Sequence, residues 1–270
     1  MKASTESAAE KVVHQRVQSQ FGAAATAYTT SVGHSDPMLL QRVIELAQPR
    51  ETDLALDIAT GAGHTALALA PHVAEVVAFD LTQQMLDETA RNAAKRGLTN
   101  VVTRQGAAEK LPFATSTFDI VTVRQAPHHY ADLRAAIREM ARVVKPDGRV
   151  VVIDSRAPED AELDRAFNDI EKLRDPSHVR NWRPSEWRTM VQEAGLRILA
   201  EYEDFYTENG KPMDFDAWTQ RMKTPPPAVE ELKGLFRTAS PALVDALRIQ
   251  IEGDKIGFCV PQIALAATKD

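Results

Sequence analysis

The sequence predicts a doubly wound α/β fold, in which helices cover both faces of a mostly parallel sheet of seven strands. Two observations carry this prediction. Between residues 50 and 155, short apolar runs alternate with amphipathic helical segments, an order typical of parallel strands joined by crossover helices. The chain has 270 residues, of which 44% are hydrophobic, and this supplies enough apolar material for one core.

The strands and helices are predicted from apolar runs, helical spacing and turn residues. Five strands fall before residue 155, and the helices between them end at signals such as Gly97. A sixth and a seventh strand follow, separated by further helices. The expected strands are 54–59, 75–80, 100–105, 118–124, 149–154, 196–205 and 256–267, and the main helices are 11–27, 37–48, 83–96, 133–144, 161–174, 184–194, 214–223 and 228–249.

This order of elements predicts three parts. Residues 1–49 form N-terminal lid helices, and 50–206 with 256–270 form the core. Residues 207–255 stand between the last two strands and are expected to form a helical cap insertion. The helix over 228–249 serves either the cap or a contact in a homodimer.

Composition excludes several classes of protein. The formal net charge is -6, which argues against broad attraction to nucleic acid or to an anionic membrane. No run approaches the 18 apolar residues of a membrane-spanning helix, and the start lacks the apolar stretch of a signal peptide. The single cysteine, Cys259, allows no internal disulfide. We therefore expect a soluble, cytoplasmic protein.

A glycine turn and a later acid predict a nucleoside-binding site. Open α/β sheets bind ligands at the carboxyl ends of their strands, where Thr60-Gly61-Ala62-Gly63 follows the first strand. Gly61 can adopt a positive φ, and Gly63 lets a ligand approach the backbone. Asp80 ends the second strand and can accept both hydroxyls of a ribose. The alternatives are a plain strand-to-helix turn and a solvated acid.

Five segments stand in a fixed order across about residues 50–155: Leu56–Gly63, Val77–Thr82, Leu111–Phe113, Phe118–Val121 and Arg138–Gly148. In order and spacing they resemble the class I S-adenosyl-L-methionine (SAM)-dependent methyltransferases of the ubiquinone/menaquinone-biosynthesis type. The segment Val17–Gly22 looks like the N-terminal lid of that family. The resemblance implies a Rossmann-like fold and SAM as the cofactor.

The resemblance also implies roles for single residues. Asp57 should anchor the amino end of SAM, and Asp80 should hold its ribose hydroxyls. The remaining residues that it assigns to the donor are Thr60, Gly61 and Gly63 at the methionine part, Leu81 and Met85 beside the adenine, and Arg124 and Gln125 at the sulfonium and the methyl path.

One turn departs from the family. The family reads Gly-Asp-Ala-Glu where this chain reads Gly106-Ala107-Ala108-Glu109. Ala107 replaces the acid that binds the adenine amino group. Ala107, Ala108 and Glu109 are still expected at the donor, with that hydrogen bond lost or taken over by backbone.

Two histidines follow the fourth strand, where the methyl acceptor should stand. His128 and His129 are candidate bases for removing a proton from the acceptor. The alternative is that one of them only orients a loop. With Asp132 they lack the spacing of a metal site, so no metal is expected.

Several polar residues are candidates for binding the acceptor, with surface packing or a polar connector as the alternative. They are Tyr28, His34, Arg156, His178, Arg180 and Trp182. In the cap, Met213, Phe215, Trp218, Leu235 and Phe236 suggest an enclosed, partly apolar pocket. We therefore expect a small-molecule acceptor, hydrophobic or aromatic, that is methylated on oxygen or carbon.

Three other functions compete with this one. A nicotinamide-dependent oxidoreductase shares the glycine turn and the ribose acid. A SAM-binding protein without methyl transfer is compatible with the loss at Ala107. A nucleic-acid methyltransferase is disfavoured, because Arg124–His129 replaces the Asn-Pro-Pro-Tyr-like run of the amino-methylating members.

Overall fold

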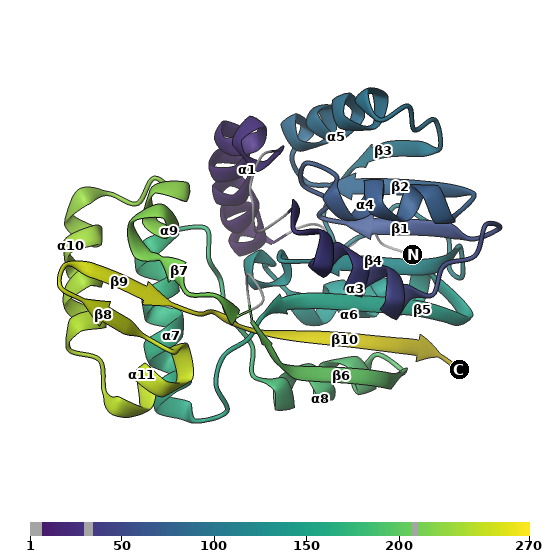
Figure 1. The fold of residues 1–270 in the computed structure, drawn as a ribbon. Helices are drawn as coiled ribbons and strands as arrows, with labels where there is room; N and C mark the ends of the chain where they lie inside the picture. Colours follow the sequence, from purple (N-terminus) through teal and green to yellow (C-terminus); the bar gives the residue numbers. More distant parts are fainter. Residues whose placement is uncertain (1–6, 30–34, 207–209) are drawn as a thin grey trace.

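The computed structural model describes residues 7–29, 35–206 and 210–270. These residues form two lobes that lie side by side, with helix α1 (Ala8–Thr29) standing between them (Figure 1). We call residues 161–174 and 210–260 the small lobe, and the remaining described residues apart from α1 the large lobe.

The large lobe is built on the predicted seven-stranded sheet, and the predicted fold class is confirmed. The strand order is β3-β2-β1-β4-β5-β10-β6. The β10 strand runs antiparallel to both of its neighbours. The order reverses between β1 and β4, so this sheet has its switch point there. The strands are β1 (Leu54–Ile58), β2 (Glu75–Asp80), β3 (Val101–Gln105), β4 (Phe118–Arg124), β5 (Val144–Ser155), β6 (Leu196–Tyr206) and β10 (Pro261–Lys269).

Two apolar clusters, one on each face, hold helices against this sheet. One contains Met140 and Trp187 from α6 and α8, and the other contains Val43 and Leu69 from α3 and α4. The buried central strands are rich in Val, Ile and Leu, as parallel strands covered on both faces require. The helices of this lobe are α3 (Pro37–Ala47), α4 (His64–Leu69), α5 (Gln83–Lys95), α6 (Leu133–Val143) and α8 (Pro184–Glu193).

The small lobe has an aromatic core of its own. Phe215, Trp218, Phe236 and Phe258 are buried together there, and Phe167 joins them from α7. Adjacent rings lie 4.8–6.0 Å apart, centroid to centroid. The elements are α7 (Ala161–Arg174), β7 (Met213–Asp214), α9 (Phe215–Arg221), α10 (Pro226–Arg237), α11 (Pro241–Leu247), β8 (Gln250–Glu252) and β9 (Lys255–Phe258).

Two predicted elements were wrong in this lobe. The helix expected over 228–249 is two helices, because Ser240 caps a new helix whose first residue is Pro241. The strand expected over 256–267 is also two. The β9 strand pairs with β7 and β8 in a separate sheet, and β10 begins at Pro261, where a residue without an N–H is tolerated. The boundaries of the predicted lid, core and cap remain a prediction.

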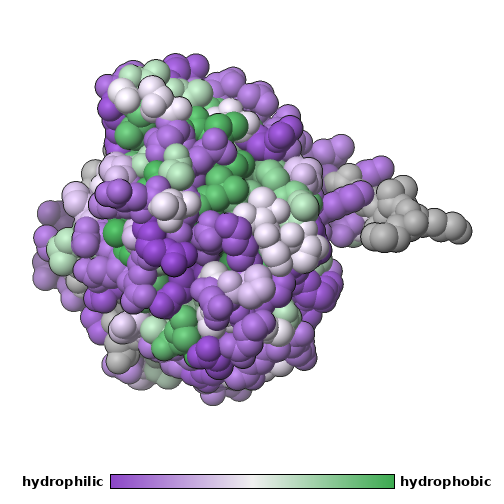
Figure 2. Space-filling model, turned by 90° about the vertical axis from the view of Figure 1, so that its right-hand side faces the viewer, coloured by the Kyte–Doolittle hydropathy of each residue, from purple (hydrophilic) through white to green (hydrophobic). Residues whose placement is uncertain are grey.

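The surface shows no broad apolar face in the view of Figure 2, where hydrophobic residues form small groups among hydrophilic ones. Within the described ranges, no helix combines the length and the apolar character needed to cross a membrane.

Candidate active site

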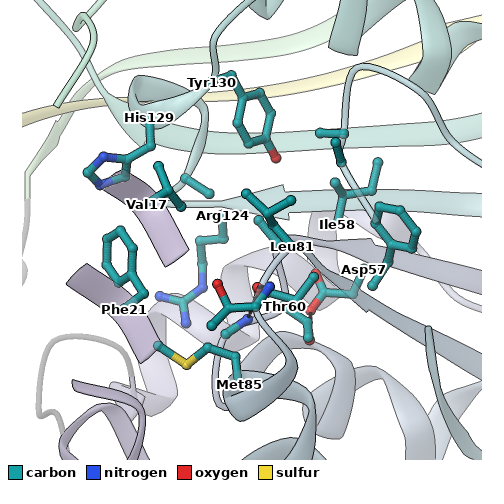
Figure 3. A pocket seen from close by; sticks show the side chains of 18 of the residues that line it. Val17, Phe21, Asp57, Ile58, Thr60, Leu81, Met85, Arg124, His129 and Tyr130 are labelled. Atoms are coloured by element: carbon teal, nitrogen blue, oxygen red, sulfur yellow. Dashed lines mark hydrogen bonds between the residues drawn. The ribbon is translucent and has the colours of Figure 1, made fainter. Parts of the chain in front are cut away.

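A first cavity opens at the carboxyl ends of β1, β2 and β4, beside the switch point of the sheet (Figure 3). Its empty volume, counted out to its open mouth, is about 940 Å³. Most of the residues expected at the donor line it: Asp57, Thr60, Gly61, Asp80, Leu81, Met85, Ala107, Ala108, Glu109, Arg124 and Gln125.

Asp57 is fixed by its own chain. Its carboxylate accepts hydrogen bonds from the hydroxyls of Thr60 and Thr122, both at 2.7 Å, and from the backbone N–H of Ala66 at 3.2 Å. Burial raises the pKa of Asp57 to about 6, against the opposing effect of these hydrogen bonds. The side chain is therefore a rigid, buried acid at the floor of the cavity.

Asp80 is held in a similar way at the end of β2. It accepts from the backbone N–H groups of Gly61 at 2.9 Å and Thr82 at 2.8 Å. Gly61 has a φ of 56°, which favours glycine. Burial raises the pKa of Asp80 to about 6, and the charge of Asp57 acts in the same direction.

Gly63 is not among the residues that line the first cavity, so its expected approach to a ligand remains a prediction. Its φ is 89°, and a Cβ here would lie 2.8 Å from the Cγ2 atom of Thr89. The position is glycine because helix α5 packs closely against the turn.

Arg124 brings a buried positive charge to the cavity. Its Nε donates to the hydroxyl of Thr65 at 3.1 Å. Burial lowers the pKa of Arg124 to about 10, against the attraction of Asp57, so the guanidinium stays charged at neutral pH. Nearby, the hydroxyl of Tyr130 is buried and has no hydrogen-bond partner among the described residues. It points into the cavity (Figure 3).

Helix α1 covers the first cavity through His14, Val17 and Phe21. These residues stand three and four positions apart, which places them on one face of the helix. Nε2 of His14 lies 3.3 Å from the carboxylate of Glu109, and Gln18 donates to the backbone carbonyl of Leu81 at 3.1 Å. His14 was not predicted as a site residue, although its spacing from Val17 and Phe21 was a usable signal.

A second cavity adjoins the first and shares Phe21, Gln125 and His129 with it. It lies between the ends of the large-lobe strands and the small lobe. Polar side chains dominate its lining. The other residues around it are His128, Ser155, Glu171, Arg174, Asp175, His178, Met213, Trp218, Arg221, Met222, Val260 and Gln262.

His128 and Asp154 form a hydrogen-bonded pair at this second cavity. Nδ1 of His128 lies 2.6 Å from one carboxylate oxygen of Asp154, and the backbone N–H of His128 donates to the other at 2.9 Å. Burial opposes a charge on the ring, but the charge of Asp154 and this hydrogen bond outweigh it and raise the pKa of His128. Asp154 was missed, although it ends a buried strand as Asp57 and Asp80 do.

His129 and His178 have a different electrostatic character. Nδ1 of His129 lies 3.0 Å from the carbonyl of Ser177, and burial followed by the charge of His128 lowers the pKa of His129 to about 3. Burial also lowers the pKa of His178, whose Nε2 lies 3.1 Å from the side-chain oxygen of Asn168. Both rings are therefore neutral at neutral pH.

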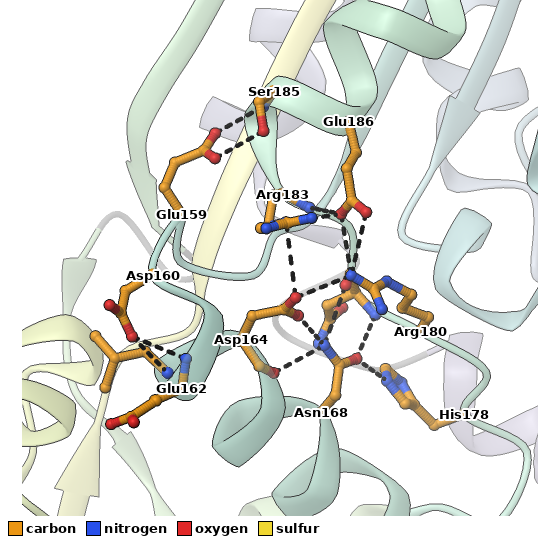
Figure 4. A network of polar contacts seen from close by, with 12 residues as sticks. Glu159, Asp160, Glu162, Asp164, Asn168, His178, Arg180, Arg183, Ser185 and Glu186 are labelled. Carbon is orange, nitrogen blue, oxygen red and sulfur yellow. Dashed lines mark hydrogen bonds and ion pairs between the residues drawn. The ribbon is translucent and has the colours of Figure 1, made fainter.

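The structure does not bring Arg156, Arg180 and Trp182 to either cavity. Arg180 pairs with Asp164 at 2.9 Å and with Glu186 at 3.1 Å, in a network that joins α7 to α8 (Figure 4). Its guanidinium also lies over the ring of Trp182, and Arg156 donates to the backbone carbonyl of Glu203. These side chains make their contacts within the protein and line neither cavity, so their expected contact with substrate remains a prediction.

Two expected substrate residues fall outside the described part. The first is His34. The second is Tyr28, of which only the backbone, in α1, is described. Across the described ranges, no cluster of three or more His, Cys, Asp or Glu side chains is arranged to hold a metal ion.

Comparisons with known proteins identify the family. Residues 56–152 match the family model described as a methyltransferase domain. The uncharacterized methyltransferase YcgJ of Bacillus subtilis is 40% identical over 84% of this chain and 88% of its own length. Its crystal structure superposes with a TM-score of 0.79, covering 85% of this chain and 97% of that one.

The chain belongs to the class I SAM-dependent methyltransferases. Its cofactor is SAM, as the sequence predicted. The uncharacterized protein YafE of Escherichia coli is 39% identical over 71% of this chain and 90% of its own length. The demethylmenaquinone methyltransferase of Thermus thermophilus is 38% identical, but over 44% of this chain and 54% of its own length. The coarse family prediction is thus confirmed, and the quinone-biosynthesis subtype remains a prediction.

The residues of the first cavity fit SAM. Asp80 offers carboxylate oxygens for a ribose, and Leu81 and Met85 are apolar partners for an adenine. The buried hydroxyl of Tyr130 has an open hydrogen-bonding position there.

Proposed function

We propose that this methyltransferase binds SAM in the first cavity and methylates a small molecule held in the second, with His128 as the base. The junction of the two cavities carries the proposal. They share Phe21, Gln125 and His129, so two ligands that fill them meet at this point. The buried His128–Asp154 pair stands on the acceptor side of the junction.

Donor binding is assigned to the first cavity. When bound, SAM supplies an electrophilic methyl group on a sulfonium. The positive charge of Arg124 fits the carboxylate of the donor, and Asp80 fits its ribose hydroxyls. Because backbone N–H groups hold Asp80 in place, little side-chain entropy is lost when it binds. Holding the donor methyl group and the acceptor in line can lower the barrier to transfer by about 7–11 kcal/mol in the best cases.

His128 is the base in this proposal, and Asp154 is a positioning residue. In the tautomer proposed here, Nδ1–H of His128 donates a hydrogen bond to Asp154, which leaves Nε2 as the nitrogen that takes a proton from the acceptor. The negative charge of Asp154 then stabilises the imidazolium that forms. General-base catalysis contributes roughly 10²–10⁴-fold in rate. His129 remains neutral and shapes the passage between the two cavities.

The acceptor is proposed to be more polar than the sequence suggested. Phe215 and Phe236 are buried in the core of the small lobe, and Leu235 is exposed. Trp218 and Met213 do line the second cavity, where they stand among charged side chains. The comparisons add nothing in favour of a nicotinamide oxidoreductase or a SAM-binding protein without transfer. A cytoplasmic location, a homodimer and the exclusion of nucleic acid as the acceptor remain predictions.

Calorimetric titration with SAM, and with NAD in parallel, tests the donor site. SAM should bind and NAD should not. Acceptors are then screened by the formation of S-adenosylhomocysteine, using the wild type, His128→Asn and the exposed control His72→Asn. We expect His128→Asn to bind SAM normally and to lose roughly 10²-fold or more in rate. Binding of NAD in place of SAM would refute the proposal.

A further inference from the structure

A buried amide beside the proposed base points to the chemistry of the acceptor. Building on the function proposed above, we propose that the second cavity takes a neutral ring compound with two neighbouring hydroxyls. One hydroxyl gives its proton to His128 and is methylated, and the other donates a hydrogen bond to the side-chain oxygen of Gln262.

Gln262 is placed in the second cavity by strand β10. The residue is 1% exposed and lines the cavity. Its side-chain oxygen is buried and has no hydrogen-bond partner among the described residues. A buried polar atom without a partner is costly, because it has lost its hydrogen bonds to water, so a ligand group that pairs with it strengthens binding. This amide is therefore a recognition element of the cavity.

Strand pairing places this amide next to His128. Gln262 is the Cα partner of Ser155 on β5, and directly opposed residues of antiparallel strands project from the same face. The hydroxyl of Ser155 lies 3.4 Å from Nδ1 of His128. Base and amide thus reach the cavity from adjacent positions, and one small ligand can contact both through neighbouring groups.

The charges around the cavity favour a neutral ligand. Two carboxylates, Glu171 and Asp175, line the cavity together with two guanidinium groups, Arg174 and Arg221, so the formal charges cancel. Arg174 is also engaged, because it lies 3.1 Å from Glu171 and its guanidinium stacks at 4.5 Å over the ring of Trp218. A carboxylate or phosphate on the ligand would be repelled by Glu171 and Asp175, and the cavity has no surplus of positive charge to offset this repulsion.

The remaining walls suit a ring. Phe21, Met213, Met222 and Val260 supply apolar surface, whereas the polar groups His128 and Gln262 belong to the sheet side. A flat or puckered ring can contact the apolar walls and turn one polar edge toward His128 and Gln262. Two hydroxyls on adjacent ring carbons form such an edge.

The transfer step balances for this ligand. The oxygen of one hydroxyl forms a bond to the methyl carbon as the bond between carbon and sulfur breaks, and the electron pair of that bond stays on sulfur. The hydroxyl proton passes to Nε2 of His128. The products are a methyl ether and S-adenosylhomocysteine, and no oxidant or metal is needed.

Quenching of tryptophan fluorescence, with Trp218 in the wall, measures ligand binding without catalysis. The probes are catechol, phenol, 3,4-dihydroxybenzoate and a methyl pyranoside, each in the presence of S-adenosylhomocysteine. Catechol or the pyranoside should bind at least about ten-fold tighter than phenol, since a missing partner for a buried polar group costs on this scale. Tighter binding of catechol would identify an aromatic ring, and tighter binding of the pyranoside would identify a saturated ring. The carboxylate of 3,4-dihydroxybenzoate should weaken binding relative to catechol.

Gln262→Met keeps the size of the side chain and removes the amide, so it should reduce the preference for diols over phenol to near unity. The exposed Gln192→Met is the matched control and should keep that preference. Equal binding of diols and phenol to the wild type, or an unchanged preference in Gln262→Met, would overturn the inference. SAM binding is measured separately, so loss of the donor site and failure of the diol site give different results.

Discussion

The two cavities are built in different ways. The first is lined by the large lobe and α1. Its carboxylates Asp57 and Asp80 are fixed by hydrogen bonds from residues near the ends of β1 and β2 and from the neighbouring β4 strand. The second needs both lobes, since Trp218 and Met222 come from one and His128 and Gln262 from the other. The difference teaches that the first cavity can form without the small lobe, whereas the second cavity depends on how the small lobe is held.

The largest effect is expected from opening a cavity in the aromatic core of the small lobe. Phe236 is 1% exposed and packs among three other aromatic rings, so Phe236→Ala should destabilise the small lobe by about 3–5 kcal/mol. Urea unfolding should show this loss, while calorimetry should show nearly unchanged SAM binding. The neighbouring exposed Leu235→Ala is the control. Loss of SAM binding in Phe236→Ala would mean that the two cavities form one energetic unit.

Asp154→Asn should have the next largest effect, and it acts on the acceptor side alone. Loss of the charge that orients His128 should lower kcat by about 100- to 1,000-fold. The pKa of His128 falls, because burial then acts without Asp154. Since the neutral ring is the base, the rise of kcat/KM with pH should move to lower pH. The exposed Asp169→Asn should leave both the rate and the profile unchanged, and an unshifted profile in Asp154→Asn would remove Asp154 from the mechanism.

Asp80→Ala tests the donor side. The carboxylate is expected to accept two hydroxyls, and hydrogen bonds to a charged group are worth about 1.5–3 kcal/mol each. SAM affinity should fall on the order of a hundred-fold in calorimetry. Asp87→Ala, on the exposed side of α5, provides the comparison and should bind as the wild type does. If Asp80→Ala binds SAM with full affinity, the ribose is held elsewhere.

The smallest effect is the pH dependence of donor binding. The pKa of Asp80 is raised to about 6 by burial, and the ionised form is the stronger acceptor. Affinity for SAM should therefore rise with pH through about 6, and it should be roughly ten-fold weaker at pH 5 than at pH 7.5. Asp80→Asn cannot ionise at this position, so its weaker binding should depend less steeply on pH, with Asp57, whose pKa is also raised to about 6, still titrating in the same cavity. A flat wild-type curve would contradict the assignment.

The sequence could predict which residues meet at the first cavity, because the signals for them are local. Asp57, Gly61 and Asp80 follow apolar runs, and parallel strands bring such ends to one edge of a sheet. Gly63 shows the limit of this reasoning, since the contact that requires a glycine there comes from Thr89 on another element. The residues around the second cavity were harder to predict from the sequence. Gln262 and Asp154 carry no motif, and a strand pairing that sequence does not specify brings them together.

Helix α1 has a kinetic consequence for the enzyme. It covers the first cavity through His14 and Val17, reaches the second through Phe21, and is hydrogen-bonded to the large lobe by Gln18 and to Met222 of the small lobe by Gln20. If SAM binds in the first cavity as proposed, its exchange for S-adenosylhomocysteine through this side displaces the helix and admits solvent to the second cavity as well. Turnover then includes an opening step common to both ligands, and this step sets an upper limit on the rate of product release.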